Sequence, residues 1–210
     1  MKGLNYFFVL GLFIILVAFQ NDNVGSYEIN TEYSVVKWTG YKIGGEHTGE
    51  LKLKEGGLDI VEGVLKGGKF TVDMTSLSCT DIKDADNNKK LVGHLKSADF
   101  FNVELHPTAT FNINKTIPYG SVKVQDGQYQ KDTYKVLGDL TIKGITKPFK
   151  TKVDIYNYDT SISGIARIEL DRSDFDIRYG SGSFFEDLGD KLIYDEIMLD
   201  VQISARAGGK

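Results

Sequence analysis

The sequence has little cysteine, little proline and no strong excess of charge of either sign. Its 210 residues include one cysteine, three prolines, and 25 basic against 29 acidic side chains, which gives a net charge of -4. A single cysteine excludes an intramolecular disulfide, so the fold must be stabilised by its core alone. The near balance of charge leaves no electrostatic footprint for a nucleic acid or an anionic membrane surface, and we expect neither as a partner.

Glycine and aromatic residues are plentiful instead. The chain carries 23 glycines, 11 tyrosines and 12 phenylalanines, and 41% of its residues are hydrophobic. This composition favours short strands joined by tight turns over a bundle of helices. At this length the chain can bury the core of one domain, and we expect that domain to be all-β.

The N-terminal segment is read as a signal peptide. Lys2 is followed by a largely apolar run over residues 6–19, which is shorter than the roughly 20 residues of a membrane-spanning helix and ends in polar residues. We therefore expect residues 1–22 to direct export, residues 25–207 to form one domain, and the protein to be periplasmic or secreted with no span in the mature chain. Because no clear cleavage site follows the run, an uncleaved N-terminal anchor remains the alternative.

Alternation of apolar and polar residues dominates the rest of the chain. Val36 and Trp38 share one face of a predicted strand, while Lys37 and Thr39 take the other. The same pattern recurs in seven more segments, 51–54, 70–74, 109–113, 136–142, 149–155, 166–170 and 197–203. The sequence thus predicts at least eight strands, each with one apolar face.

Turn signals separate these strands, and one segment breaks the alternation. Lys143-Gly144 sits between two strand patterns and predicts a tight hairpin. Residues 86–88, Asp-Asn-Asn, can cap a helix that ends near Ser97 and carries Leu91, His94 and Leu95 at helical spacing.

Eight antiparallel strands with hairpin connections predict a closed barrel, with a β-sandwich as the alternative. A barrel of this size is either filled by its own side chains or holds one small ligand. Several residues of the apolar rows are very small, and these are Gly40, Gly49, Gly138, Gly164 and Ala166. They indicate a cavity if they face inward, or strand bending if glycine is needed for the backbone.

Motifs for metal binding or catalysis are weak in this chain. Its three histidines lack paired metal-ligand spacing, and no serine lies in a nucleophile-elbow motif, so we expect no metal, no cofactor and no enzyme activity. Asp171, Asp174 and Asp176 form an acidic cluster, but Arg172 and Arg178 flank it. This pattern predicts a solvated, salt-bridged turn.

Two long motifs give the sequence a family resemblance. They are residues 93–101 followed by 106–111, and residues 138–148 with the pattern Gly-Asp-Leu-Thr-Ile-Lys-Gly-Ile-Thr-Lys-Pro. Together with residues 34–38 and the turn at 172–177, they resemble the YceI-like polyisoprenoid-binding family. The resemblance implies an eight-stranded, antiparallel, lipocalin-like barrel with one short helix, which encloses a long isoprenoid or similar amphiphile such as a quinone.

The resemblance also implies that a tail-binding tunnel is lined by the apolar rows. The candidate ligand-binding residues are Trp38, Phe70, Phe100, Phe101, Phe111, Leu140, Ile142, Ile168, Phe175 and the helix residue His94. Two other functions stay open: an enzyme acting on such a lipid, for which His94 with Asp99 is the candidate pair, and an envelope stress protein whose barrel is filled by its own core.

Overall fold

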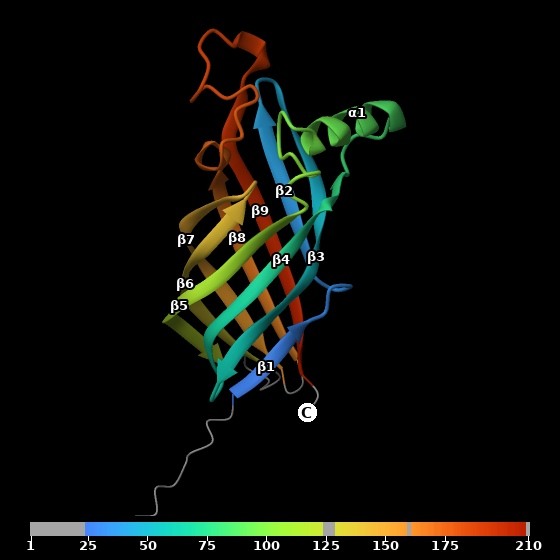
Figure 1. Cartoon of the computed structure of the whole chain (residues 1–210). Helices are drawn as coiled ribbons and strands as arrows, with labels where there is room; N and C mark the ends of the chain where they lie inside the picture. The colour runs from blue at the N-terminus through green and yellow to red at the C-terminus, as the bar shows by residue number, and fades with distance from the viewer. Residues whose placement is uncertain (1–23, 124–128, 159–160, 209–210) are drawn as a thin grey trace, which may run out of the picture.

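The computed structural model describes residues 24–123, 129–158 and 161–208. The expected signal peptide at residues 1–22 lies outside them. Along the chain the elements are β1 (Val24–Ile29), β2 (Val35–Lys42), β3 (Gly45–Val61), β4 (Val64–Cys79), α1 (Ala85–Lys96), β5 (Thr108–Lys123), β6 (Gln130–Ile142), β7 (Ile145–Asn157), β8 (Ser161–Asp171), the short 3-10 helices η1 (Arg172–Phe175) and η2 (Gly189–Lys191), and β9 (Ile193–Ala207) (Figure 1).

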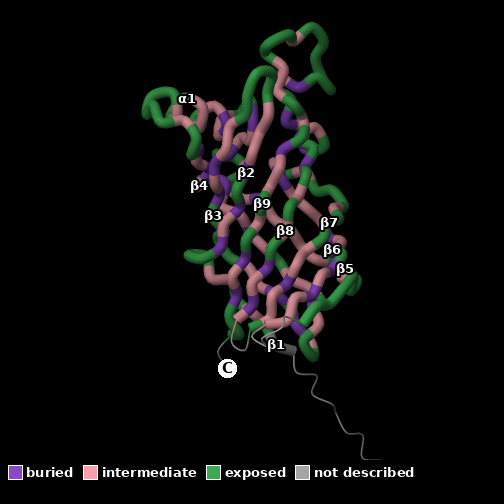
Figure 2. Tube along the Cα trace, turned by 180° about the vertical axis from the view of Figure 1, so that it is seen from behind, coloured by how far each residue is buried: buried purple, intermediate pink, exposed green. Residues whose placement is uncertain are grey.

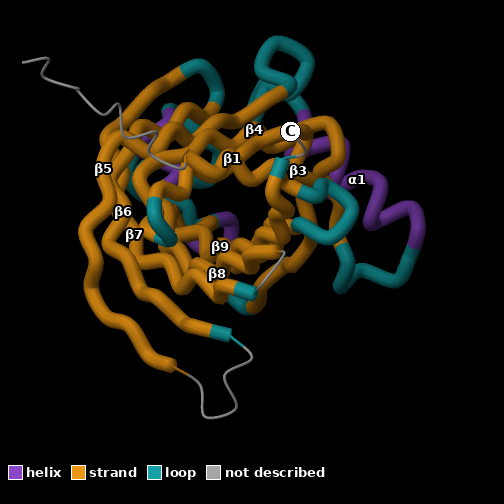
Figure 3. The backbone as a smooth tube through the Cα atoms, turned by 90° about the horizontal axis from the view of Figure 1, so that it is seen from below, coloured by secondary structure: helices purple, strands orange, loops and turns teal. Residues whose placement is uncertain are grey.

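The strands form one antiparallel sheet that closes on itself. Their order is β1-β3-β2-β9-β8-β7-β6-β5-β4, and β4 also pairs with β3, which completes the ring. Seen along its axis, the ring of strands surrounds a central space (Figure 3). The predicted barrel is therefore confirmed, and the sandwich alternative is wrong because all strands of the described residues belong to one sheet that closes on itself.

The first two strands share one position in the barrel wall. Both β1 and β2 lie between β3 and β9, β2 at the end of the barrel that carries α1 and β1 at the opposite end. We call these the helix end and the β1 end. Between the two strands the Ser34 hydroxyl donates to the Asn30 carbonyl (2.7 Å) and accepts from the Ser204 amide (2.9 Å), which ties the interruption to β9.

The tight hairpin joins β6 to β7 as predicted. Ile142 pairs with Ile145, and both turn residues, Lys143 (φ 51°) and Gly144 (φ 75°), adopt the left-handed conformation of a primed turn. The helix ends at Ser97 as expected but begins earlier than predicted. The N-cap of the helix is Asp84, whose carboxylate accepts a hydrogen bond from the backbone amide of Asn87 (2.9 Å). A spacing of three residues is the one that an N-cap side chain needs to reach a free amide of the first turn.

Side chains of the two barrel ends form separate buried clusters. Figure 2 shows buried residues alternating with more exposed ones along the strands. The β1-end cluster consists of Leu58, Ile60, Leu65, Tyr134, Val136, Ile155, Ile162 and Ala205. The larger helix-end cluster includes Val36, Trp38, Leu51, Met74, Leu77, Leu95, Phe100, Ile142, Phe175 and Ile177.

Arg172 corrects one expectation from the sequence, because its side chain is fully buried rather than solvated. Its guanidinium donates to four carbonyl oxygens, those of Ile177, Tyr179, Ile193 and Tyr194, and lies 3.1 Å from the Asp195 carboxylate. Burial lowers the pKa of Arg172, and the nearby carboxylates of Asp195 and Asp171 oppose this shift. The other residues match the predicted turn, since Asp171 and Asp174 are exposed and Arg178 forms an exposed ion pair with Asp176. Arg172 thus holds the 176–195 loop on the barrel.

Candidate functional site

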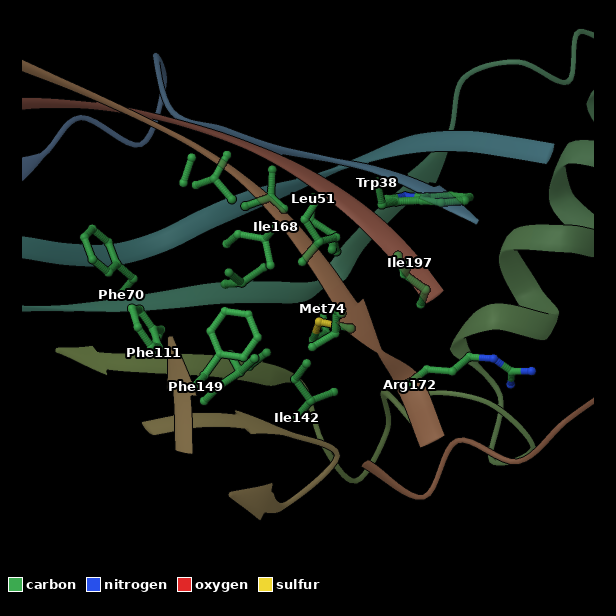
Figure 4. Close-up of a pocket in the computed structure, with 18 of the residues that line it drawn as sticks. Trp38, Leu51, Phe70, Met74, Phe111, Ile142, Phe149, Ile168, Arg172 and Ile197 are labelled. Atoms are coloured by element: carbon green, nitrogen blue, oxygen red, sulfur yellow. The ribbon is translucent and has the colours of Figure 1, made fainter. Parts of the chain in front are cut away.

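An elongated cavity of about 410 Å³ lies inside the barrel. Residues from all eight strands β2 to β9 line it, together with α1 and the segment that follows α1. The side chains drawn in Figure 4 are hydrocarbon or aromatic along most of its length, from Phe70 and Phe111 at one end to Trp38 and Arg172 at the other. The inward rows of the predicted strands therefore meet around a space and do not fill it.

Nine of the ten candidate residues lie on the wall of this cavity. They are Trp38, Phe70, His94, Phe100, Phe101, Phe111, Leu140, Ile142 and Ile168. The exception is Phe175, which does not line the cavity and is 1% exposed inside the helix-end cluster. Phe175 is the last residue of η1, and its side chain is packed in the buried core. Contact between the nine residues and a ligand stays a prediction.

Three phenylalanines contribute aromatic surface towards the β1 end of the cavity. Phe70 and Phe111 are opposite one another on the paired strands β4 and β5. The ring of Phe149 on β7 meets Phe111 edge to face, with 6.2 Å between centroids. Edge-to-face packing fixes these rings without polar contacts, so this part of the wall offers only apolar surface.

Trp38 also offers only its ring to the cavity. Its indole N–H donates to the Ser78 carbonyl across the barrel wall (3.1 Å). A Cβ on Gly49 would lie 2.6 Å from the Trp38 ring and 1.8 Å from the Ser78 carbonyl oxygen, so glycine is required there.

The small residues of the apolar rows divide into two groups. Gly40, Gly164 and Ala166 line the cavity, as the cavity interpretation predicts. Gly138 is not among the residues that line the cavity. A Cβ at Gly138 would lie 2.1 Å from the Asn112 carbonyl oxygen. Gly138 therefore serves close strand packing, as Gly49 does, and the expectation that it adds ligand space is wrong.

Most of the polar side chains on the wall lie at the helix end. His94 Nε2 is buried and has no hydrogen-bond partner within the described residues. Its ring packs edge to face on Tyr179, with 4.3 Å between centroids. Tyr41, Lys42 and Tyr194 line the same end. The Asp99 side chain is exposed, and within the described residues it forms no hydrogen bond with His94. The candidate catalytic pair of His94 and Asp99 is therefore not assembled.

A second polar cluster surrounds Asp81 beside the cavity-lining His47. The Asp81 carboxylate accepts hydrogen bonds from His47 Nδ1 (2.9 Å), the Thr48 amide (2.9 Å) and Cys79 Sγ (3.2 Å). Burial alone would raise the pKa of Asp81, but these hydrogen bonds outweigh it and hold the pKa well below its usual range. Burial and the Asp81 carboxylate raise the pKa of the Cys79 thiol, which disfavours a reactive thiolate.

Several cavity residues were not selected from the sequence. Phe149 on β7, and Ile197, Leu199 and Val201 on β9, line the wall. Their alternation placed them on the apolar faces of strands, so extending the candidate list along each row would have found them. Arg172 could not be found this way, because its neighbours in sequence are acidic and its burial depends on distant carbonyl groups.

The described residues contain no helix of the length and hydropathy needed to cross a bilayer. In those same ranges no three histidine, cysteine, aspartate or glutamate side chains converge as a metal site would require.

A model of the YceI-like domain matches residues 27–205, which is most of the chain. The protein belongs to the YceI-like family. Its YceI-like relatives include a UPF0312 protein of Azotobacter vinelandii, 34% identical over 83 residues that cover 40% of this chain and 35% of the relative. A second is the UPF0312 protein ECA1782 of Pectobacterium atrosepticum, 33% identical over 116 residues that cover 51% of this chain and 52% of the relative. The chain therefore spans about a third to a half of these relatives.

Two solved structures share the YceI-like barrel. BcnA of Burkholderia cenocepacia superposes with a TM-score of 0.65 at 20% identity, over 84% of this chain and 98% of that one. A polyisoprenoid binding domain from Saccharophagus degradans, implicated in plant cell wall breakdown, superposes with a TM-score of 0.62 at 12% identity, over 87% and 98%. At these identities the likeness shows a common fold.

Proposed function

We propose that the protein binds a long amphiphilic lipid of the isoprenoid class and holds its apolar tail inside the barrel, to carry or store it. The cavity supports this proposal above all. Its volume of about 410 Å³ falls within the range of ligand pockets, roughly 300–1,000 Å³, and its wall is hydrocarbon and aromatic along most of its length. A barrel filled by its own core would leave no such volume, so the structural-protein alternative is disfavoured.

Burial of the tail can supply the affinity without polar contacts. Each buried CH₂ contributes about 0.8 kcal/mol, so one five-carbon isoprene unit contributes at most about 4 kcal/mol. The absence of a recognisable ligand motif in the sequence agrees with such binding. An isoprenoid is favoured over other tails because the Saccharophagus degradans domain of the same fold is described as polyisoprenoid binding.

The helix end favours an uncharged head group, such as an alcohol or a quinone carbonyl. His94 Nε2 is buried there without a partner and can make one hydrogen bond to such a group. Arg172 lines the same end, but its N–H groups are already bound to carbonyl oxygens and to Asp195. Lys42, the other lysine or arginine on the described wall, is exposed at the rim and supplies one ammonium group, whereas a pyrophosphate would need several charged donors together.

A chain-length series tests the proposal. Purified protein is extracted for bound lipid, analysed by mass spectrometry, and then titrated with farnesol, geranylgeraniol and longer prenyl alcohols. Affinity should rise with each added unit until the cavity is full and should change little with salt. Affinity that does not depend on chain length would refute tail burial, and a steep salt dependence would refute the uncharged head group.

Binding is favoured over catalysis because His94 and Asp99 are not brought together. We also propose that the barrel acts outside the cytoplasm, on the basis of the apolar run at residues 6–19. Cell fractionation with N-terminal sequencing of the mature protein tests this location. Recovery of the full-length chain in the cytoplasm would contradict it.

A further inference from the structure

The neighbouring strands β7 and β8 of the barrel wall are paired over only part of their length. β7 and β8 pair only near the β1 end, over the four residue pairs from Asp154↔Ile165 to Asn157↔Ile162. Beyond these pairs both strands continue towards the helix end, and in that described stretch they do not pair with each other. Each stays paired on its other side, β7 with β6 and β8 with β9. We call the unpaired stretch, residues 148–153 of β7 and 166–169 of β8, the seam.

A surface hollow lies directly over the seam. It is lined by Pro148, Phe149, Lys150, Thr151, Arg167, Ile168 and Glu169. Three of these residues, Phe149, Thr151 and Ile168, also line the main cavity, into which Phe149 and Ile168 point in Figure 4. The same side chains therefore separate the cavity from the outside, with no backbone hydrogen bonds joining the two strands between them.

Like charges meet at the first outward position beyond the paired part of the two strands, and opposite charges meet at the next, where Lys150 would stand opposite Glu169. The last pair, Asp154↔Ile165, faces outward. If its register continued, the next outward pair would be Lys152 opposite Arg167. Like charges directly opposite one another disfavour strand pairing. Both cations are drawn away from the seam, since Lys152 Nζ lies 4.2 Å from the centre of the Tyr119 ring and Arg167 Nε lies 3.8 Å from Asp200. In the seam, the backbone N–H and C=O groups of β7 therefore do not form ladder hydrogen bonds with those of β8.

Buried side chains line the cavity towards both ends of the barrel. At the β1 end lies the buried cluster, four members of which, Leu58, Leu65, Val136 and Ile155, also form part of the cavity wall. At the helix end, residues of α1 and the Phe100-Phe101 pair line the cavity, and the Arg172 hydrogen bonds join the start of the 176–195 segment to β9. At the seam, the side chains of Phe149, Thr151 and Ile168 lie between the cavity and the surface hollow.

We infer that the seam is a lateral portal through which the apolar chain of the lipid enters and leaves the cavity, and that the two strands pair more extensively when it is shut. This inference rests on the proposed function. It predicts that holding the seam closed slows exchange of the lipid, whereas holding the paired part of the same two strands does not.

A disulfide across the seam tests the portal. In a Cys79→Ser background, Lys150→Cys with Glu169→Cys places thiols opposite one another in the continued register, and Tyr156→Cys with Ser163→Cys is the matched pair where the strands are already joined. Release of a fluorescent prenyl alcohol to phosphatidylcholine vesicles is followed in oxidised and reduced protein. A bifunctional thiol reagent with a short spacer replaces the disulfide if oxidation does not form it.

The seam crosslink should slow both loading and release at least tenfold, with recovery after reduction, while the matched crosslink leaves both rates within twofold. Unchanged exchange through a crosslinked seam would overturn the portal and assign the route to the helix end. Failure of the reduced protein to bind the probe would instead overturn the proposed function, so the two failures are distinguishable.

A charge pair provides a second test that needs no crosslink. Lys152→Glu places a carboxylate opposite Arg167 and should favour the closed seam, slowing release several-fold. Lys150→Glu makes the same change of net charge but places two carboxylates opposite one another at Glu169, and should leave release unchanged or faster. Equal rates for the two variants would contradict the role of the seam.

Discussion

Filling the cavity at Gly40 is the most direct test of where the tail lies. Gly40 lines the cavity, and a Cβ there would meet only Trp38, at 4.0 Å. In Gly40→Leu the four added carbons would occupy ligand space. At about 0.8 kcal/mol per buried CH₂, loss of an equal length of tail costs about 3 kcal/mol, or roughly 100-fold in Kd.

The stability of the apo protein should change little, because the new side chain meets apolar surface without a clash. Gly138→Leu is the matched control, since it adds the same side chain in the same barrel. Its Cβ would lie 2.1 Å from the Asn112 carbonyl oxygen, so we expect it to destabilise the fold by about 3 kcal/mol. The measurements are titration with a fluorescent prenyl alcohol and urea unfolding of the apo proteins.

The two variants should thus separate affinity from stability. A Gly40→Leu protein that binds the probe within twofold of the unsubstituted protein would refute the placement of the tail beside Trp38. A Gly138→Leu protein of unchanged stability would show that the strands can separate there at little cost, against the close packing described above.

Three further predictions concern Arg172, Asp81 and Phe100. Arg172→Ala should destabilise the protein by about 3–5 kcal/mol in urea unfolding, because it leaves the Asp195 carboxylate without its buried cation and removes the donor from four carbonyl oxygens; a loss below 1 kcal/mol would contradict a structural role. Asp81 has a pKa depressed by folding, so its contribution to stability is complete above the unfolded pKa, near 3.8, and is lost as the pH falls towards the folded pKa. Asp81→Asn should therefore lower the melting temperature at pH 7 and much less at pH 2, and an equal loss at both would refute this. Phe100→Ala should cost about 3–5 kcal/mol of apo stability, since the ring is 4% exposed, and a change in lipid affinity alone would place it with the ligand instead.

Local signals in the sequence were sufficient for eight of the strands and for the tight hairpin, whereas β1 lies outside the predicted segments and the sequence left a sandwich open beside the barrel. Alternation has a period that only strands share, and the pair Lys143-Gly144 marks a turn whose geometry follows from its residues. The start of the helix was displaced because Asp84 and Asp86 are both adequate caps, and only the folded backbone selects between them.

The roles of individual residues depended on distant partners and could not be predicted in the same way. Gly40 and Gly138 look alike in sequence, but a carbonyl of the neighbouring strand approaches only the second. Phe175 carries the same apolar ring as Phe111, yet it follows the end of a strand and turns into the core. The seam depends on which residues of β7 and β8 face each other, and this is set by the register of the whole barrel.

The shared position of β1 and β2 in the wall has a consequence for how the barrel assembles. β9, the last strand of the chain, is the partner of both of these first strands and of β8. No closed ring can exist before the C-terminal residues are available, and the contacts that close it join segments separated by nearly the full length of the chain. Such non-local pairing slows folding and leaves strand edges exposed until the final step. Removing β9 would therefore leave an open sheet with unpaired edges instead of a smaller barrel.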